Sequence, residues 1–392
     1  MTVSCTTPHG LSIVILGLSV TSSWGNGHAT TYRGLMRELV RRGHRVTFLE
    51  RDRPWYADNR DLPKPPYGVT HIYRSLRQLR SRFQTLVGDA DLVMIGSFVP
   101  QGTEIGEWVT RTARGVTAFY DIDTPVTLAK LARDDADYVT RALVRRYDLY
   151  LSFTGGPLLE RLERRYGARR ALPLYCSVDP TIYAPRDRCT RWDLGYMGTY
   201  SDDRQPALQR LLCEPARAWP EGRFAVAGPQ YPTHIAWPRN VRRVQHLAPK
   251  RHRDFYTSQR FTLNITRAEM VRAGWSPSVR LFEAAACATP IISDRWSGIE
   301  AFLTPDREIL LARNGGDTIS YIRDIPDAER RAIGIRARDR ILNNHTAAHR
   351  AAELEAYLLE TLRAREAVGR AAHAVGVRAA SRIPAGAGGQ AS

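Results

Sequence analysis

Apolar and polar positions alternate along the chain in blocks that change from a strand pattern to a helix pattern and back. The predominantly apolar run Leu11–Leu18 is typical of a strand covered on both faces. A polar loop with two glycines, Ser19–His28, separates it from Ala29–Arg42, whose apolar residues recur at helical spacing up to Gly43. Because Arg45–Glu50 then returns to a strand pattern, the chain opens with a strand–helix–strand unit, the building block of parallel α/β sheets.

The same alternation continues through most of the chain and predicts an α/β protein of two domains. A segment punctuated by prolines, Leu172–Pro185, is the best linker candidate. We predict further strands on both sides of it, at Leu92–Ile95, Val116–Tyr120, Leu149–Phe153, Leu194–Met197, Phe224–Ala227, Phe261–Ile265 and Pro290–Ser293. The expected organisation is a first domain over 1–172, a second over 173–345, a helix packing back over 346–366 and a disordered tail over 367–392.

Composition agrees with two globular domains and adds an excess of positive charge. The 392 residues include 43% hydrophobic residues, enough to bury two cores, and carry a formal net charge of +17. Arginine supplies almost all of this charge, scattered through segments that also hold acids, and lysine occurs only at Lys64, Lys130 and Lys250. Two interpretations stay open: an arginine bias on solvated surfaces, or a polyanionic partner such as nucleic acid, an anionic membrane or a phosphorylated substrate.

The cysteines and the first apolar run bear on location. The five cysteines are far apart and lack the spacing of a zinc site or a disulfide framework, which favours a reducing, cytoplasmic compartment. The apolar run Leu11–Val20 is about half as long as a membrane span requires. We therefore expect a cytoplasmic protein without a transmembrane segment, and peripheral attachment to a membrane remains open.

The loop after the first strand is a candidate ligand loop. In parallel α/β folds, ligands bind beyond the carboxyl ends of strands, where loops meet helix N-termini. Gly25, Asn26 and Gly27 would allow close backbone approach, and His28 at the helix start could act as a base or a hydrogen-bond donor. The alternative is a flexible surface loop. The spacing is not that of the dinucleotide fingerprint, so NAD binding is not supported.

A second candidate follows the strand Val116–Tyr120. Asp121 and Asp123 flank an isoleucine, and Thr124-Pro125 then opens a helix. Two carboxylates at this spacing can hold a divalent metal against a pyrophosphate, Asp123 can instead cap the helix, or the pair can face the cleft in an acceptor or catalytic role. The three possibilities stay open, although we expect no metal.

The richest stretch runs from Asn264 to Glu283. Arg267 stands just past a predicted strand, where its guanidinium could grip a diphosphate. Ser276 would be the N-cap of the next helix and Pro277 its first residue. Arg280 and Glu283 then share one helical face, on which the carboxylate could bind ribose hydroxyls and the guanidinium a phosphate. The competing interpretation is an ion pair on a surface helix.

These residues carry a resemblance to a known family. The pattern Ser-x-Arg-Leu-Phe-Glu-Ala-x-Ala-Cys-x-Thr-Pro-Ile-Ile, from Ser278 to Ile292, resembles the donor-site block of GT-B glycosyltransferases, and most of all that of the CgeB-like (spore maturation protein-like) glycosyltransferases. The resemblance spans about Ser12 to Leu362. It implies two facing Rossmann-like domains, a ribose-binding role for Glu283, and a phosphate-covering loop at Gly198, Thr199 and Tyr200. It also implies that Gly25–His28 line the acceptor side.

The resemblance implies sugar transfer from a nucleoside-diphosphate sugar, by a hexosyltransferase of the retaining type that needs neither metal nor cofactor. Two positions depart from the related family-4 pattern: Ala288 replaces a glycine, and Trp275 replaces an acid that helps to hold the donor sugar. We expect an acceptor that is an anionic glycan, a glycolipid or a protein. A nucleotide-sugar epimerase of the same fold and a nucleic-acid-binding protein are the alternatives, and nucleic acid is the less favoured partner.

Overall fold

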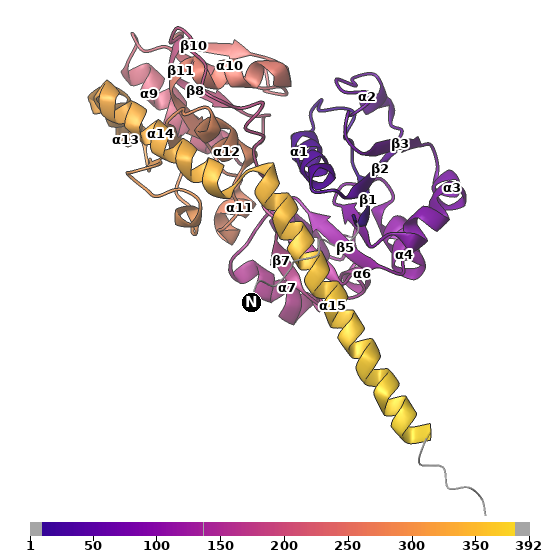
Figure 1. Ribbon diagram of the computed structural model, residues 1–392. Helices are drawn as coiled ribbons and strands as arrows, with labels where there is room; N and C mark the ends of the chain where they lie inside the picture. The colour runs from indigo at the N-terminus through magenta and orange to yellow at the C-terminus, as the bar shows by residue number, and fades with distance from the viewer. Residues whose placement is uncertain (1–9, 136, 381–392) are drawn as a thin grey trace, which may run out of the picture.

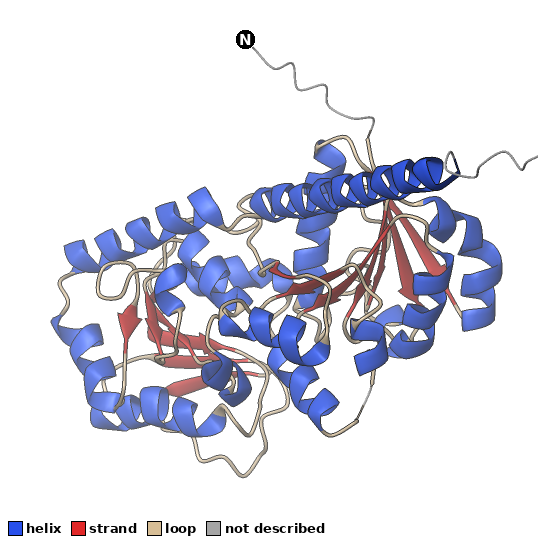
Figure 2. Cartoon of the chain, turned by 90° about the horizontal axis from the view of Figure 1, so that it is seen from below, coloured by secondary structure: helices blue, strands red, loops and turns tan. Residues whose placement is uncertain are grey.

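The computed structural model describes residues 10–135 and 137–380, which form two α/β domains joined side by side (Figures 1 and 2). Each domain is built on one sheet, both sheets are parallel, and helices cover their faces. The predicted α/β class with two parallel-sheet domains is confirmed.

The first domain carries a seven-stranded sheet in the order β3-β2-β1-β4-β5-β6-β7. Its strands are β1 (Ser12–Gly17), β2 (Arg45–Arg51), β3 (Val69–Tyr73), β4 (Leu92–Gly96), β5 (Val116–Asp121), β6 (Leu149–Ser152) and β7 (Ala171–Pro173). Its helices are α1 (His28–Arg41), α2 (Pro54–Ala57), α3 (Leu76–Asp89), α4 (Gly102–Thr112), α5 (Thr124–Ala132), α6 (Arg141–Val144) and α7 (Pro157–Tyr166). The apolar run of β1 is central: Ile13 pairs with Val46 on one side and Leu92 on the other.

The second domain carries a six-stranded sheet in the order β10-β9-β8-β11-β12-β13. Its strands are β8 (Trp192–Met197), β9 (Phe224–Ala227), β10 (Val241–Val244), β11 (Gln259–Asn264), β12 (Ile291–Ser293) and β13 (Leu310–Leu311). Its helices are α8 (Gln205–Leu208), α9 (Glu214–Ala218), α10 (His252–Thr257), α11 (Ala268–Ala273), α12 (Val279–Ala286), α13 (Gly315–Asp324) and α14 (Asp327–Asn344), with a π-helical turn, Gln209–Cys213, between α8 and α9.

The predicted strands are present, with ends that shift by about two residues or less. The strands that the sequence pattern did not reveal are β3, β7, β10 and β13, and each is an edge strand of its sheet. β3, β7 and β10 are only partly buried and β13 has two residues, so none has the long continuous apolar run that marks a central parallel strand. Leu172 and Pro173 of β7 fall in the segment predicted as a linker from its prolines.

The chain crosses between the domains twice, and the two crossings are paired. Val178 in the linker forms a parallel bridge with Thr346, where the N–H of Val178 donates to His345 and the N–H of Ala347 donates to Val178. Helix α15 (Ala347–Ala380) then returns across the first domain, packing on α1 (Figure 1). Leu354 and Leu358 of α15 are fully buried there.

The tail expected to be disordered from residue 367 is helical as far as Ala380, so that prediction is wrong for 367–380. The segment is rich in alanine and arginine, which favour helix, and the first proline after it is Pro384. Residues 381–392 lie outside the described part of the chain. Within residues 10–135 and 137–380, no helix is both long and apolar enough to cross a membrane.

Candidate active site

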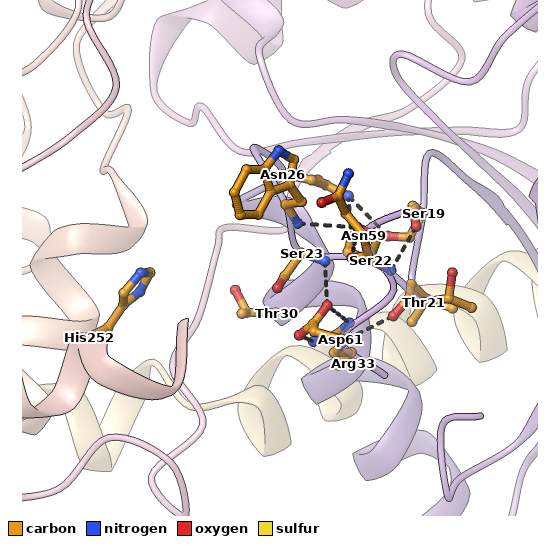
Figure 3. Close-up of polar contacts among 12 residues, drawn as sticks. Ser19, Thr21, Ser22, Ser23, Asn26, Thr30, Arg33, Asn59, Asp61 and His252 are labelled. Atoms are coloured by element: carbon orange, nitrogen blue, oxygen red, sulfur yellow. Dashed lines mark hydrogen bonds and ion pairs between the residues drawn. The ribbon is translucent and has the colours of Figure 1, made fainter. Parts of the chain in front are cut away.

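A pocket of about 240 Å³ opens between the two domains, at the carboxyl ends of the strands of both sheets. The first domain contributes the loop between β1 and α1, including Gly25, Asn26 and Gly27, and Thr30 of α1. The second domain contributes residues that follow β8, β9 and β10 or belong to α10 and α12: Met197, Gly198, Thr199, Gly228, Pro229, His246, Leu247, Pro249, His252, Tyr256, Val279, Arg280 and Glu283. Figure 3 shows His252 facing the first-domain loop from the opposite wall.

Arg280 lines this pocket and is held by neutral acceptors. Its Nε donates to the carbonyl of Met197 (2.6 Å) and its Nη1 to Oδ1 of Asn264 (2.7 Å). Gly198 makes this approach possible, because a Cβ at Gly198 would lie 3.1 Å from Nη2 of Arg280. No carboxylate of the described residues forms an ion pair with the guanidinium, which leaves its positive charge available to an anion.

Glu283 lies three residues further along α12 and is 5% exposed. Its Oε2 accepts a hydrogen bond from the hydroxyl of Tyr256 (3.1 Å). Burial raises the pKa of Glu283 to about 7, and the hydrogen bonds from Tyr183 and Tyr256 and the charge of Arg280 oppose this only in part. A carboxylate buried at the wall of a pocket lacks the donors that water would supply, so it favours a ligand with hydroxyl groups.

Two histidines, His246 and His252, line the pocket near the start of α10. Nε2 of His252 contacts the carbonyl of Leu247 at 3.1 Å, which ties the start of α10 to the preceding loop. Across the domain boundary the ring of Trp24 packs against that of His246 at a tilt of 43°, with centroids 4.0 Å apart. This aromatic contact joins the two domains beside the pocket.

Glu50, near the end of β2, holds the first-domain loop in place through hydrogen bonds. The Glu50 carboxylate accepts four hydrogen bonds, from the hydroxyls of Ser19 (2.9 Å) and Thr21 (2.6 Å) and from the N–H groups of Val20 (2.8 Å) and Thr21 (3.0 Å). Because Glu50 is fully buried, this charge serves the loop and not the pocket.

Asp61 provides a second fastening, drawn in Figure 3. It accepts two hydrogen bonds from the Arg33 guanidinium (2.9 and 3.0 Å) and one from the N–H of Ser23 (2.8 Å). Burial alone would raise the pKa of Asp61, but these hydrogen bonds and the charge of Arg33 lower it to about 2. Asn26 completes the loop, since its side chain donates to the carbonyl of Ser19 and accepts from the N–H of His28.

His28 begins α1 but does not line the pocket. Its ring packs parallel to Phe98 and edge-on to Phe153, which follow β4 and β6. Burial lowers the pKa of His28 to about 4, so the imidazole is neutral, and its Nδ1 has no hydrogen-bond partner among the described residues. A neutral imidazole with a free nitrogen can accept or donate one hydrogen bond to a ligand at this edge of the sheet.

Asp121 does not reach the cleft, which corrects its assignment as a candidate catalytic group. It is fully buried and accepts hydrogen bonds from the hydroxyls of Tyr150 (2.5 Å) and Thr127 (2.9 Å). Burial raises its pKa to about 6. The sequence pattern could not predict that Asp121 is buried, because its burial depends on β4 and β6, which pair with β5 on either side.

Asp123 and Arg267 meet across the domain boundary. Arg267 Nη1 lies 3.7 Å from Oδ2 of Asp123, and its Nε lies 3.8 Å from Asp203. Asp123 occupies the N-cap position of α5 without a side-chain capping hydrogen bond, and burial raises its pKa to about 6. Arg267 is therefore paired with two carboxylates and does not line the pocket. The sequence predicted instead that its guanidinium would bind a diphosphate.

The helix predicted to begin at Pro277 begins later: α12 starts at Val279 with Ser278 at its N-cap, so neither Ser276 nor Pro277 occupies the expected position. Ser276 instead shares a hydrogen bond with Thr154 of the first domain (2.8 Å). The carbonyl of Trp275 accepts from the N–H of Gly155 (2.9 Å), so this segment joins the domains. Trp275 adopts a left-handed φ of 44° because Ser297 and Gly155 bond its backbone on both sides.

The remaining predicted residues divide in a simple way. Gly25, Asn26, Gly27, Gly198, Thr199, Arg280 and Glu283 come together in the pocket, whereas Tyr200 packs edge-on against Tyr231 beside it. The sequence analysis did not predict that Glu50 and Asp61 hold the first-domain loop. It also did not predict that Gly228, His246 and His252 line the pocket. A buried strand that ends in an acid was the available signal for Glu50. Among the described residues, no cluster of three potential metal ligands occurs.

Comparison with known proteins places this geometry in context. Residues 204–356 match the family model of glycosyl transferase-like proteins. No curated protein matches the sequence significantly. The structure is similar to sucrose-phosphate synthase from Thermosynechococcus elongatus, with a TM-score of 0.65 and 14% identity over 90% of this chain and 100% of that one.

Two further solved structures are similar over the same extent. Anabaena HepE in complex with UDP and glucose has a TM-score of 0.66 and 12% identity, covering 89% of this chain and 99% of HepE. An alpha-glucosyltransferase in complex with UDP-glucose and DNA containing an abasic site has a TM-score of 0.67 and 12% identity, covering 89% of this chain and 100% of that one. These likenesses show that the chain has the GT-B fold.

Proposed function

We propose that this protein is a glycosyltransferase of the CgeB-like type that transfers a sugar from a nucleoside-diphosphate sugar to an acceptor hydroxyl. The observation that carries the proposal is the placement of Arg280 and Glu283 on one turn of α12, both lining a pocket between two domains. Arg280 supplies an unneutralised positive charge and Glu283 a buried hydroxyl acceptor, which suit a diphosphate and a ribose. The match of residues 204–356 to glycosyl transferase-like proteins supports the same activity.

The donor occupies the second-domain wall in this proposal. The ribose hydroxyls donate to Glu283, and the diphosphate lies between Arg280, the backbone at Gly198 and Thr199, and the N-terminus of α12, whose free N–H groups favour an anion. The base lies near Leu247 and His252. Because UDP or UDP-glucose is bound in the similar HepE and alpha-glucosyltransferase structures, UDP is the first nucleotide to test.

In the reaction, the acceptor oxygen forms a bond to the anomeric carbon as the bond from that carbon to the diphosphate oxygen breaks. The nucleoside diphosphate leaves with the bonding electrons, and Arg280 and the α12 N-terminus stabilise the charge that develops on it. The acceptor proton passes to a base on the first-domain side. Asp123, whose pKa is raised to about 6, and neutral His28 are the candidates for receiving or orienting that proton.

Several finer features belong to the proposal. The arginine and the helix N-terminus offset the diphosphate charge without a metal ion, and the sugar is transferred with retention of anomeric configuration, as in the family that the sequence resembles. We also propose a cytoplasmic location, since Cys176, Cys189, Cys213 and Cys287 are all free. Activity in EDTA and the anomeric configuration of the product by NMR test the first two features.

The primary test is calorimetric titration with UDP, GDP and dTDP, followed by the matching nucleotide sugars. We expect one nucleotide to bind at micromolar concentration or better, and Glu283→Ala to lose about 100-fold or more in affinity, because two ribose hydroxyls lose their acceptor. Circular dichroism of the variant shows whether the fold is retained. Binding of no nucleotide by the wild type, or unchanged affinity in a folded Glu283→Ala, contradicts the assignment. Release of an epimerised free nucleotide sugar would identify an epimerase instead.

A further inference from the structure

An exposed tryptophan stands beside the acceptor-side loop of the pocket. Trp55 in α2 is 59% exposed and is the one aromatic residue among the exposed large hydrophobic side chains of the described residues. A Cβ placed on Gly25 would lie 3.9 Å from Nε1 of Trp55, so the indole borders the loop that lines the pocket. Figure 1 shows α2 at the end of the first domain where α1 also begins. The position of Trp55 therefore continues the pocket wall onto the open surface.

Arginines surround the strand ends next to α2. Arg51 ends β2 with its guanidinium 5.7 Å from the centre of the Tyr73 ring, and Arg74 follows β3 with its side chain 84% exposed. Burial raises the pKa of Tyr73, and the charges of Arg51 and Arg53 oppose this shift. We call Arg51, Arg53, Trp55 and Arg74 the arginine–tryptophan surface.

This surface has more positive charge than its own acids neutralise. Among the described residues, Arg51 and Arg53 form no ion pair, and Nε and Nη1 of Arg51 and the hydroxyl of Tyr73 have no hydrogen-bond partner. Asp52 lies 3.8 Å from Arg74 but is already bonded to Arg60 at 2.8 Å. The unpartnered atoms of Arg51 are buried, whereas Arg53 is exposed, and an exposed guanidinium that no acid pairs with can bind an anion supplied by a ligand.

Acids lie between these arginines in the sequence, and they indicate which kind of polyanion the surface favours. Asp52 and Asp58 stand on the same short segment as Arg53 and Trp55, where they would repel a continuous row of phosphates. Carboxylates can instead accept hydrogen bonds from sugar hydroxyls, and the flat indole offers an apolar face to a sugar ring. The mixture of charges thus favours a ligand that carries hydroxyls as well as anionic groups.

We propose that the arginine–tryptophan surface binds an acidic glycan, one bearing carboxylate, sulfate or phosphate groups, as the acceptor of the reaction. The inference rests on the proposed glycosyltransferase function and names its acceptor class. The acceptor end enters the pocket past Gly25, and the rest of the glycan extends over Trp55 toward Arg53 and Arg74.

The test uses a fluorescein-labelled heparin hexasaccharide as the anionic glycan, with maltohexaose as neutral competitor and a duplex DNA 12-mer as the nucleic-acid competitor. We expect Arg53→Glu/Arg74→Glu to weaken heparin binding by about tenfold or more and Trp55→Ala by about threefold. The matched control is Arg331→Glu/Arg340→Glu on exposed positions of α14, which makes the same change in net charge and should leave binding within about twofold of wild type.

The same samples are titrated with UDP. Normal UDP binding with equal heparin affinity in the surface variant and the α14 control overturns the acceptor surface while the glycosyltransferase proposal stands. Loss of heparin binding confined to the surface variants, with UDP binding intact, supports the surface. Displacement of heparin by the DNA 12-mer at lower concentration than by unlabelled heparin overturns the glycan assignment in favour of nucleic acid. Failure of the wild type to bind any nucleotide overturns the proposed function itself.

Discussion

The second-domain wall of the pocket presents charged groups to the cavity, whereas the first-domain wall presents backbone and small polar side chains. Arg280 and Glu283 line the cavity themselves. The first domain also has acids at this edge, but Glu50 and Asp61 bond the loop from behind and do not line the pocket. The second-domain wall therefore acts through charge and the first-domain wall through shape, and the acids of the first domain hold that shape.

Substituting one glycine in each wall tests most directly whether the second-domain wall acts through charge and the first-domain wall through shape. A Cβ at Gly198 would lie 2.6 Å from the Tyr196 hydroxyl and 3.1 Å from Arg280, so Gly198→Ala should displace the guanidinium and weaken UDP binding by about 100-fold. A Cβ at Gly27 would meet no atom within 4 Å, and Gly27 has a φ of −62°. Gly27→Ala should therefore change UDP affinity by less than about twofold. Calorimetry measures both, and equal losses would contradict the division between charge and shape.

Glu50 tests whether the first-domain loop is held by its buried carboxylate. Glu50→Gln replaces one acceptor oxygen by an amide that faces donors, and should lower the free energy of unfolding by about 2 kcal/mol. Asp137→Asn, which breaks an exposed ion pair with Lys130 in the same domain, should cost less than about 0.5 kcal/mol. Urea unfolding compares the variants. A Glu50→Gln protein as stable as Asp137→Asn would show that the loop holds its shape without the clamp.

The pH dependence of donor binding tests the charged wall. With the pKa of Glu283 raised to about 7, the carboxyl is mostly protonated at pH 6 and mostly ionised at pH 8. Ribose hydroxyls donate to the ionised form, so binding selects it, and affinity for UDP-glucose should rise about tenfold over this interval. The same raised pKa makes the folded protein less stable as pH rises from about 4.5 through 7, because the unfolded chain releases the proton at lower pH. An equal rise in affinity in Glu283→Gln would trace it to another group.

The smallest expected effect is at the contact between the walls. Trp24→Ala removes the tilted ring contact with His246 and should weaken nucleotide binding by about threefold, because the pocket loses one contact between the domains and keeps its charged groups. His246→Ala should give the same change, and the double variant should not add to it. Additive losses would mean that the two rings contact the nucleotide independently.

Much of the fold could be predicted from the apolar pattern, and the exceptions have a common cause. Central strands such as β1 and β4 are buried on both faces, so their sequences are apolar throughout. The edge strands β3 and β10 include exposed positions, and their residues carry no comparable signal. Their place in the sheets depends on neighbours distant in sequence.

The donor wall could be predicted in part because its groups are local. Arg280 and Glu283 lie three apart on one helix, so helical geometry places them together whatever surrounds them. Arg267 could not be placed in the same way: its position just after β11 suggested a phosphate ligand, and only the packing of the domains shows its partners to be Asp123 and Asp203.

The sequence by itself determined the α/β class, the two domains and the helix that carries Arg280 and Glu283, because these follow from the spacing of residues within single elements. Only the tertiary structure decided that Asp121 is buried, that Glu50 and Asp61 hold the loop between β1 and α1, and that Trp55 borders this loop. Those relations join residues on different strands and loops, and the burial and charge that define them arise only when the sheets have formed.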